Sequence, residues 1–69
     1  MQIKFTRHAI EQIKERGISE DDVINAIKYP EITNKIDGVY YAQKKTIQGI
    51  IEVVYLRETY IKVITVYPI

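Results

Sequence analysis

Pro30 divides this 69-residue chain into two halves with different hydrophobic patterns. Before Pro30, apolar residues recur three and four positions apart, which is the spacing of an amphipathic helix. After it, β-branched and aromatic residues are separated by turn-forming residues, as is typical of strands. A proline lacks the backbone N–H that a helix needs, so no helix can continue past Tyr29. The chain is therefore predicted to form an α+β domain, with helices first and strands second.

The first half contains start and stop signals for two helices. Thr6 is a suitable N-cap for a helix over residues 7–16, and Gly17 is suited to the left-handed residue that ends it. Ser19, with an acidic residue three positions later, predicts the start of a second helix over residues 19–29. The acidic residues of "SEDD" then lie in the positively polarised first turn, so capping explains them without a metal.

The second half predicts an antiparallel sheet of about four strands. Asp37-Gly38 is a strong signal for a two-residue hairpin turn, and Gly49 marks a second turn. A third two-residue turn at Glu58-Thr59 would place Glu52 opposite Thr65. Both faces of the last two strands are largely apolar, so we expect helices over one face and leave a partner chain open for the other. Whether "QIKF" adds a short edge strand also stays open.

Composition limits the chemistry that this small domain can carry. The chain has no cysteine and one histidine, which excludes a disulfide framework, a thiol nucleophile and a multi-histidine metal site. It contains no glycine-rich phosphate loop and no nucleophile elbow. Ten Lys and Arg residues against nine Asp and Glu residues give a net charge of +1, which is not the balance of a strongly basic nucleic-acid binder. Without a recognisable signal peptide or membrane span, we expect one soluble, cytoplasmic domain over residues 1–69 that uses no cofactor.

A polar stripe on the first predicted helix is the first candidate site. His8, Gln12 and Arg16 are spaced four residues apart, so a helix aligns them on one side. The imidazole could transfer protons near neutral pH, and the guanidinium could hold a phosphate. Both also have structural interpretations, because His8 could pack against Phe5 or cap a strand carbonyl and Arg16 could interact with the helix C-terminus.

Basic and aromatic residues in the strands form a second group of candidates. Lys44 and Lys45 could contact phosphates, or could protect a sheet edge from aggregation. Tyrosines on a sheet can stack on unpaired RNA bases, although most are half-buried structural residues. We favour the structural role for Tyr55 and leave open the role of Tyr67, which lies near the C-terminus beside Thr65. The remaining choice is between metal-free acid–base chemistry and no chemistry.

Three segments, in order, resemble a small prokaryotic domain of unknown function: "FTRHAIEQIKERGISEDDVINAIKYPE", "VYYAQKK" and "EVVYLRETYIKVITVYP". That family opens with F-[ST]-x-H-A, continues through E-R-G-I-S and closes on T-V-Y. It is similar to the RelE/ParE and BrnT toxins, within the broader group of barnase-, EndoU- and colicin-like ribonuclease folds. The resemblance implies a RelE-like fold, in which two N-terminal helices pack on one face of a twisted antiparallel sheet of about four strands.

The resemblance also implies metal-free RNA cleavage by activation of a ribose 2′-hydroxyl. The first hypothesis is therefore a toxin-like endoribonuclease that acts on RNA and is paired with an antitoxin protein. The alternative is a non-catalytic module of the same fold, whose apolar sheet face binds a partner chain or forms a homodimer. Carried over by position, the candidate catalytic residues are His8, Arg16 and Tyr67, and the candidate RNA-binding residues are Lys44, Lys45 and Thr65.

Overall fold

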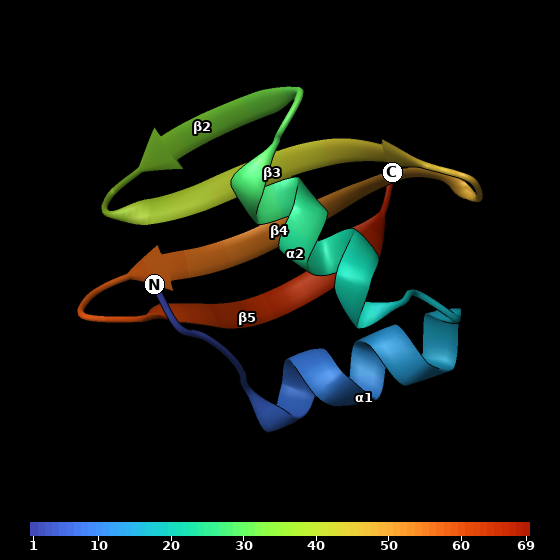
Figure 1. Ribbon diagram of the computed structural model, residues 1–69, viewed down its shortest axis with the longest axis horizontal. Helices are drawn as coiled ribbons and strands as arrows, with labels where there is room; N and C mark the ends of the chain where they lie inside the picture. The colour runs from blue at the N-terminus through green and yellow to red at the C-terminus, as the bar shows by residue number, and fades with distance from the viewer.

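The chain forms one short strand, then two helices, then four longer strands (Figure 1). The computed structural model describes all residues, 1–69. The strands assemble into one five-stranded sheet in the order β1-β5-β4-β3-β2. None of the helices is long and apolar enough to cross a membrane. The elements are β1 (Ile3–Phe5), α1 (Arg7–Arg16), α2 (Glu20–Lys28), β2 (Ile32–Ile36), β3 (Val39–Thr46), β4 (Gly49–Arg57) and β5 (Ile61–Pro68).

The predicted four-stranded antiparallel sheet is wrong. The sheet has five strands and is mixed, because β1 pairs in parallel with β5, with Ile3 opposite Ile61 and Phe5 opposite Val63. The other neighbouring strands are antiparallel. A strand of three residues is too short to show an alternating pattern, and its partner lies at the other end of the chain. The domain is still α+β, but the RelE-like arrangement of two helices over four antiparallel strands is not what forms.

Both helices begin and end at their capping signals. The side-chain oxygens of Thr6 and Ser19 each accept a hydrogen bond from the backbone N–H three residues later, at 3.1 Å in both cases. Gly17 adopts a left-handed conformation with φ of 64°, which glycine adopts without a steric penalty. The three capping residues are therefore confirmed, and α2 is one residue shorter at each end than predicted.

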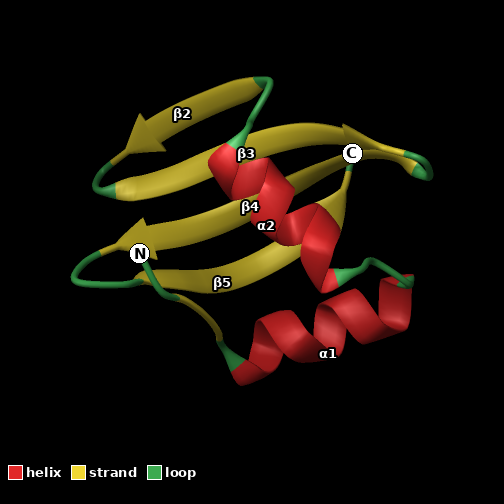
Figure 2. Cartoon of the chain, viewed as in Figure 1, coloured by secondary structure: helices red, strands yellow, loops and turns green.

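The core lies between the helices and one face of the sheet. In Figure 2, α2 crosses this face and α1 runs beside β5, beyond the end of the short edge strand β1. No helix covers the opposite face, here termed the open face (Figures 1 and 2). The core consists of small and branched apolar residues from both layers, with one tyrosine: Ala9, Ile13, Val23, Ala26, Ile27, Ala42, Ile51, Val53, Tyr55, Ile61, Val63 and Val66.

Two of the hairpins differ in how well their turns could be predicted. The turn at Asp37-Gly38 is confirmed, because both residues have positive φ, 51° and 80°. The last hairpin is longer than predicted, since Arg57 pairs with Ile61 and leaves residues 58–60 in the loop.

A bulge in β5 changes the register of the last hairpin a second time. Tyr55 pairs with Val63, whereas Val54 pairs with Thr65, so Ile64 is the extra residue. The longer loop and the bulge each shift the pairing by one residue, and the prediction that Glu52 lies opposite Thr65 is wrong. Glu52 lies opposite Tyr67.

Candidate functional site

Hydrogen bonds join the start and middle of α1 to β5, beyond the point where β1 ends. β1 pairs with β5 only as far as Val63, so the backbone groups beyond that point need other partners. Thr6 supplies two of them: its N–H donates to the Val63 carbonyl at 3.0 Å and its hydroxyl to the Ile64 carbonyl at 3.1 Å. Further along, the Gln12 side-chain oxygen accepts the Val66 N–H at 3.0 Å. This line of contacts is here termed the α1–β5 seam.

The predicted polar stripe of α1 follows this seam. Gln12 lies at its centre and also accepts a hydrogen bond from the Thr65 hydroxyl. His8 and Arg16 are exposed one helical turn to either side of Gln12, so they lie about 12 Å apart along the helix axis. Because α1 and β5 run in the same direction along the seam, Arg16 lies towards the end that carries Tyr67.

His8 lies at the surface of α1. Its side chain is exposed, so it is not packed against the core, whereas Phe5 is. The carbonyls of Val63 and Ile64 in β5 accept hydrogen bonds from Thr6 and not from His8.

A row of three polar residues crosses the open face next to the seam. Gln43 on β3, Glu52 on β4 and Tyr67 on β5 are direct cross-strand neighbours. Each of them has a core residue next to it in its strand, namely Ala42, Ile51 with Val53, and Val66, so strand alternation directs these three side chains to the open face. The Gln43 amide donates to Glu52 Oε2 at 3.0 Å, and the Tyr67 hydroxyl donates to Glu52 Oε1. These three residues are here termed the polar row.

The polar row keeps Tyr67 protonated and leaves Glu52 able to accept more hydrogen bonds. The hydrogen bond to Glu52, together with burial and the carboxylate charge, raises the pKa of Tyr67 to about 12. A carboxylate has about four lone-pair sites, and two of those on Glu52 are used inside the row. Glu52 is only partly buried, so its free sites can be reached from the open face. The row therefore offers a carboxylate acceptor that the neutral Tyr67 holds in place.

The two candidate lysines lie on opposite faces of the sheet. Lys45 is exposed and follows Gln43 by two residues in β3, which places it on the open face near the polar row. Lys44 is directed to the helix side, where its ammonium donates to the Tyr29 carbonyl at 2.9 Å and so caps the end of α2. Lys44 is therefore separate from the other candidates, whereas Thr65, Tyr67 and Arg16 lie along or beside the seam.

Glu52 and Gln43 were missed as functional candidates in the sequence. The signal for Glu52 is that one acidic residue interrupts an otherwise apolar strand, "IIEVVYL", where an unpaired carboxylate is costly. The predicted register concealed its partner, because Glu52 was placed opposite Thr65 and not Tyr67. No group of three or more His, Asp or Glu side chains in the chain could hold a metal ion.

A comparison with protein families gives one result. The profile of DUF4258, described as a domain of unknown function, matches residues 5–68. The chain belongs to the DUF4258 family. Every residue of the seam and of the polar row lies within the matched DUF4258 domain. This family match gives no support for a relationship to the RelE, ParE or BrnT toxins. No significant match to this DUF4258 chain was found among curated proteins or among solved structures.

Proposed function

We propose that the polar row and the α1–β5 seam form the active site of a metal-independent endoribonuclease. The observation that carries this proposal is the Glu52 carboxylate, which two donors hold in place on the uncovered face of the sheet. The exposed Lys45 lies on the neighbouring strand β3, and Arg16 and His8 lie on α1, which packs against β5. The resemblance of the F-[ST]-x-H-A and T-V-Y segments to RelE/ParE and BrnT toxins supports an RNA substrate by analogy.

The proposed reaction is a transesterification within the RNA strand. The Glu52 carboxylate removes the proton of a ribose 2′-hydroxyl, and the 2′-oxygen attacks the adjacent phosphorus. The bond from phosphorus to the 5′-oxygen breaks, and His8 in its protonated form donates a proton to that departing oxygen. The products are a 2′,3′-cyclic phosphate and a 5′-hydroxyl, and solvent restores the two protonation states. No metal ion takes part in these steps.

The other candidates have binding and positioning roles in this proposal. Arg16 holds a non-bridging phosphate oxygen with its planar guanidinium, and Lys45 holds a neighbouring phosphate of the strand. Tyr67 fixes the orientation of Glu52, and Thr65 with Gln12 holds α1 against β5.

A toxin of this kind acts in the cytoplasm, where an antitoxin protein that covers the open face would block it.

The test is cleavage of a labelled single-stranded RNA by the purified chain in the presence of a chelator. We expect Glu52→Gln to lower the cleavage rate by roughly 10²-fold or more, because an amide cannot accept the proton. Glu58→Gln is the matched control, since Glu58 is exposed in the loop between β4 and β5 and should leave the rate unchanged. Equal rates for the two variants would remove Glu52 from the mechanism, and no cleavage by the wild type would overturn the proposed function.

The exposed edge strand β2 favours a second candidate function, a module that binds another chain. All five residues of β2 are exposed, and Ile32 and Ile36 remain 53% and 58% exposed. One edge of β2 has no neighbouring strand, so its backbone groups can pair with a second copy or with a partner protein. Light scattering of the wild type tests the homodimer: a monomer at all concentrations contradicts it, whereas a dimer that Ile36→Lys dissociates supports it.

A further inference from the structure

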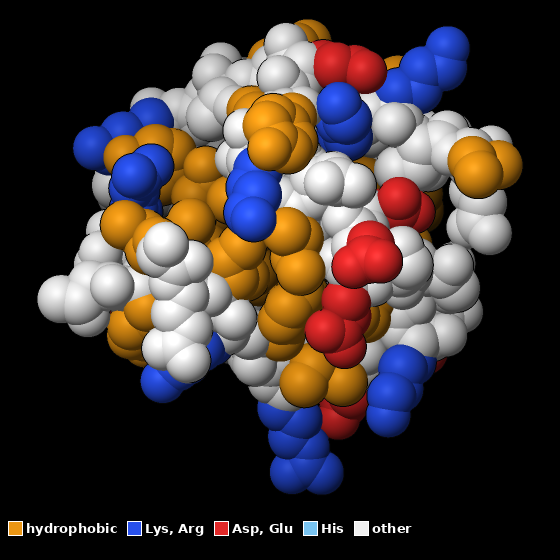
Figure 3. All heavy atoms as spheres, viewed as in Figure 1, with side chains coloured by type: hydrophobic (Ala, Val, Ile, Leu, Met, Phe, Trp, Pro, Cys, Tyr) orange, Lys and Arg blue, Asp and Glu red, His pale blue; other side chains and the backbone are white.

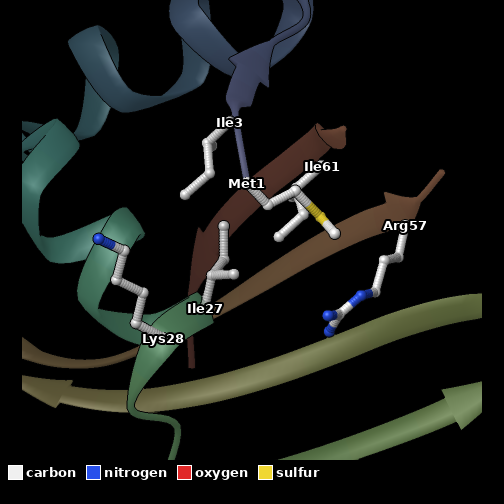
Figure 4. Close-up of a pocket in the computed structure, with 6 residues that line it drawn as sticks. All are labelled: Met1, Ile3, Ile27, Lys28, Arg57 and Ile61. Carbon is white, nitrogen blue, oxygen red and sulfur yellow. The ribbon is translucent and has the colours of Figure 1, made fainter. Parts of the chain in front are cut away.

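A hollow opens on the helix-covered side of the sheet, on the other side from the polar row. It lies where the end of α2 meets β1, the end of β4 and the start of β5. Its volume is about 260 Å³, which suits a compact molecule. The residues that line it are Met1, Ile3, Ile27, Lys28, Arg57 and Ile61 (Figure 4).

Four of the six residues that line the hollow are apolar, and the other two are the basic residues Lys28 and Arg57. In Figure 4 the side chains of Ile3, Ile27 and Ile61 approach one another around the centre. Arg57 lies on one side, and the Lys28 side chain extends on the other (Figure 4). A ligand would therefore meet hydrocarbon inside and positive charge at the rim.

The charges of Lys28 and Arg57 are not neutralised within the chain. The only ion pair joins Arg7 to Glu11 on α1. Figure 3 shows Lys and Arg side chains around an apolar surface on the left of the helix-covered side, and the acidic side chains visible there lie on the right. Lys28 is in the last turn of α2, where a cation stabilises the helix, but Arg57 ends a strand and has no such role.

Arg57 follows Tyr55 by two residues in β4, and Tyr55 stacks on Tyr40. The rings of Tyr40 and Tyr55 are parallel within 7°, with centroids 5.0 Å apart, and the Lys35 ammonium is 5.2 Å from the Tyr40 centroid. Burial raises the pKa of the Tyr55 hydroxyl, and the nearby positive charge of Arg57 partly opposes this rise. Arg57 thus lines the hollow and also lies close to Tyr55.

We propose that this hollow binds a compact organic anion, with an apolar or aromatic body among the isoleucines and a carboxylate or phosphate on Arg57. The planar guanidinium can bind either group through two parallel hydrogen bonds, and Lys28 adds long-range attraction. A simple aromatic carboxylate and a nucleoside monophosphate share this chemistry. The proposal does not depend on RNA cleavage, since the polar row lies on the open face.

Methyl NMR of the full chain, with benzoate and with adenosine 5′-monophosphate as separate probes, tests the proposal. We expect at least one probe to shift the methyl signals of Ile27 and Ile61. If benzoate binds, benzamide, which lacks the charge, should bind at least about tenfold more weakly than benzoate. Shifts with benzoate alone identify a carboxylate site, and shifts with the nucleotide alone identify a phosphate site. No shift with either anion would overturn the proposal, and so would binding of benzoate that benzamide equals.

Two variants separate this site from other cations and from the polar row. Arg57→Gln should weaken binding of the probe that binds the wild type by about tenfold or more, because it removes the guanidinium that holds the carboxylate or phosphate. Arg7→Gln, at another exposed arginine, and Glu52→Gln should bind as the wild type does. Unchanged affinity in Arg57→Gln would contradict the assignment, whereas loss of RNA cleavage in Glu52→Gln with intact anion binding would show that the two sites are independent.

Discussion

At the scale of single residues, the pairing of Glu52 with Tyr67 makes a measurable prediction. The Tyr67 hydroxyl loses its charged acceptor in Glu52→Gln, so the pKa of Tyr67 should fall from about 12 towards the ordinary tyrosine value of 10.0. Titration of tyrosinate absorbance, with Tyr67→Phe to assign the signal, measures this pKa. The Glu58→Gln control should leave it unchanged, and a pKa that stays high in Glu52→Gln would mean that the carboxylate is not the cause.

The same hydrogen bond links stability to alkaline pH. The pKa of Tyr67 is higher in the folded chain than in the unfolded chain, so its contribution to stability is complete below about pH 10 and is lost as the pH rises through about 12. We expect the free energy of unfolding of the wild type to fall more steeply across this interval than that of Tyr67→Phe. Urea unfolding at several alkaline pH values measures both slopes, and equal slopes would contradict the raised pKa.

At the scale of elements, the two N-caps should differ in their contributions to stability. Ser19→Ala removes one capping bond and should cost about 1 kcal/mol. Thr6→Ala removes the cap of α1 and also the bond from the Thr6 hydroxyl to the Ile64 carbonyl, so it should cost about 2 kcal/mol. Urea unfolding gives both values, and equal costs would mean that the bond at the seam contributes nothing.

The helices could be predicted from the sequence because their determinants are local. The caps Thr6, Ser19 and Gly17 lie within a few residues of the bonds they make. The mixed sheet could not be predicted in the same way, since β1 joins a strand from the far end of the chain. The loop at residues 58–60 and the bulge at Ile64 depend on packing between strands and helices, which no short pattern encodes.

The candidate site also contains some residues that local patterns predict and others that only the folded sheet brings together. The stripe of His8, Gln12 and Arg16 follows from helical spacing alone, and Gln12 does lie against Thr65. The pair of Glu52 and Tyr67 depends on the register of the last hairpin, so an error of two residues concealed it. Lys44 looked like Lys45 in the sequence, but its partner is a backbone carbonyl that only the folded α2 presents.

At the scale of the whole molecule, the covered and open faces of the sheet should tolerate substitution differently. Ile51 is 4% exposed in the core, whereas its neighbour Ile50 is 40% exposed on the open face. Ile51→Val should cost about 0.5–1.5 kcal/mol and Ile50→Val less than about 0.5 kcal/mol, because only the first leaves a cavity. Denaturant unfolding of both variants measures the difference, and a reversed order would mean that the helices cover the other face.

The function proposed for the open face predicts the chemistry of the RNA ends. Mass spectrometry of RNA fragments made by the chelator-treated wild type should show 2′,3′-cyclic phosphates and 5′-hydroxyls, since the 2′-oxygen is the proposed nucleophile. An RNA with one 2′-deoxy residue at the cleavage site should remain intact there. Fragments that carry 5′-phosphates and 3′-hydroxyls, or cleavage beside the 2′-deoxy residue, would contradict a reaction that begins with proton removal by Glu52.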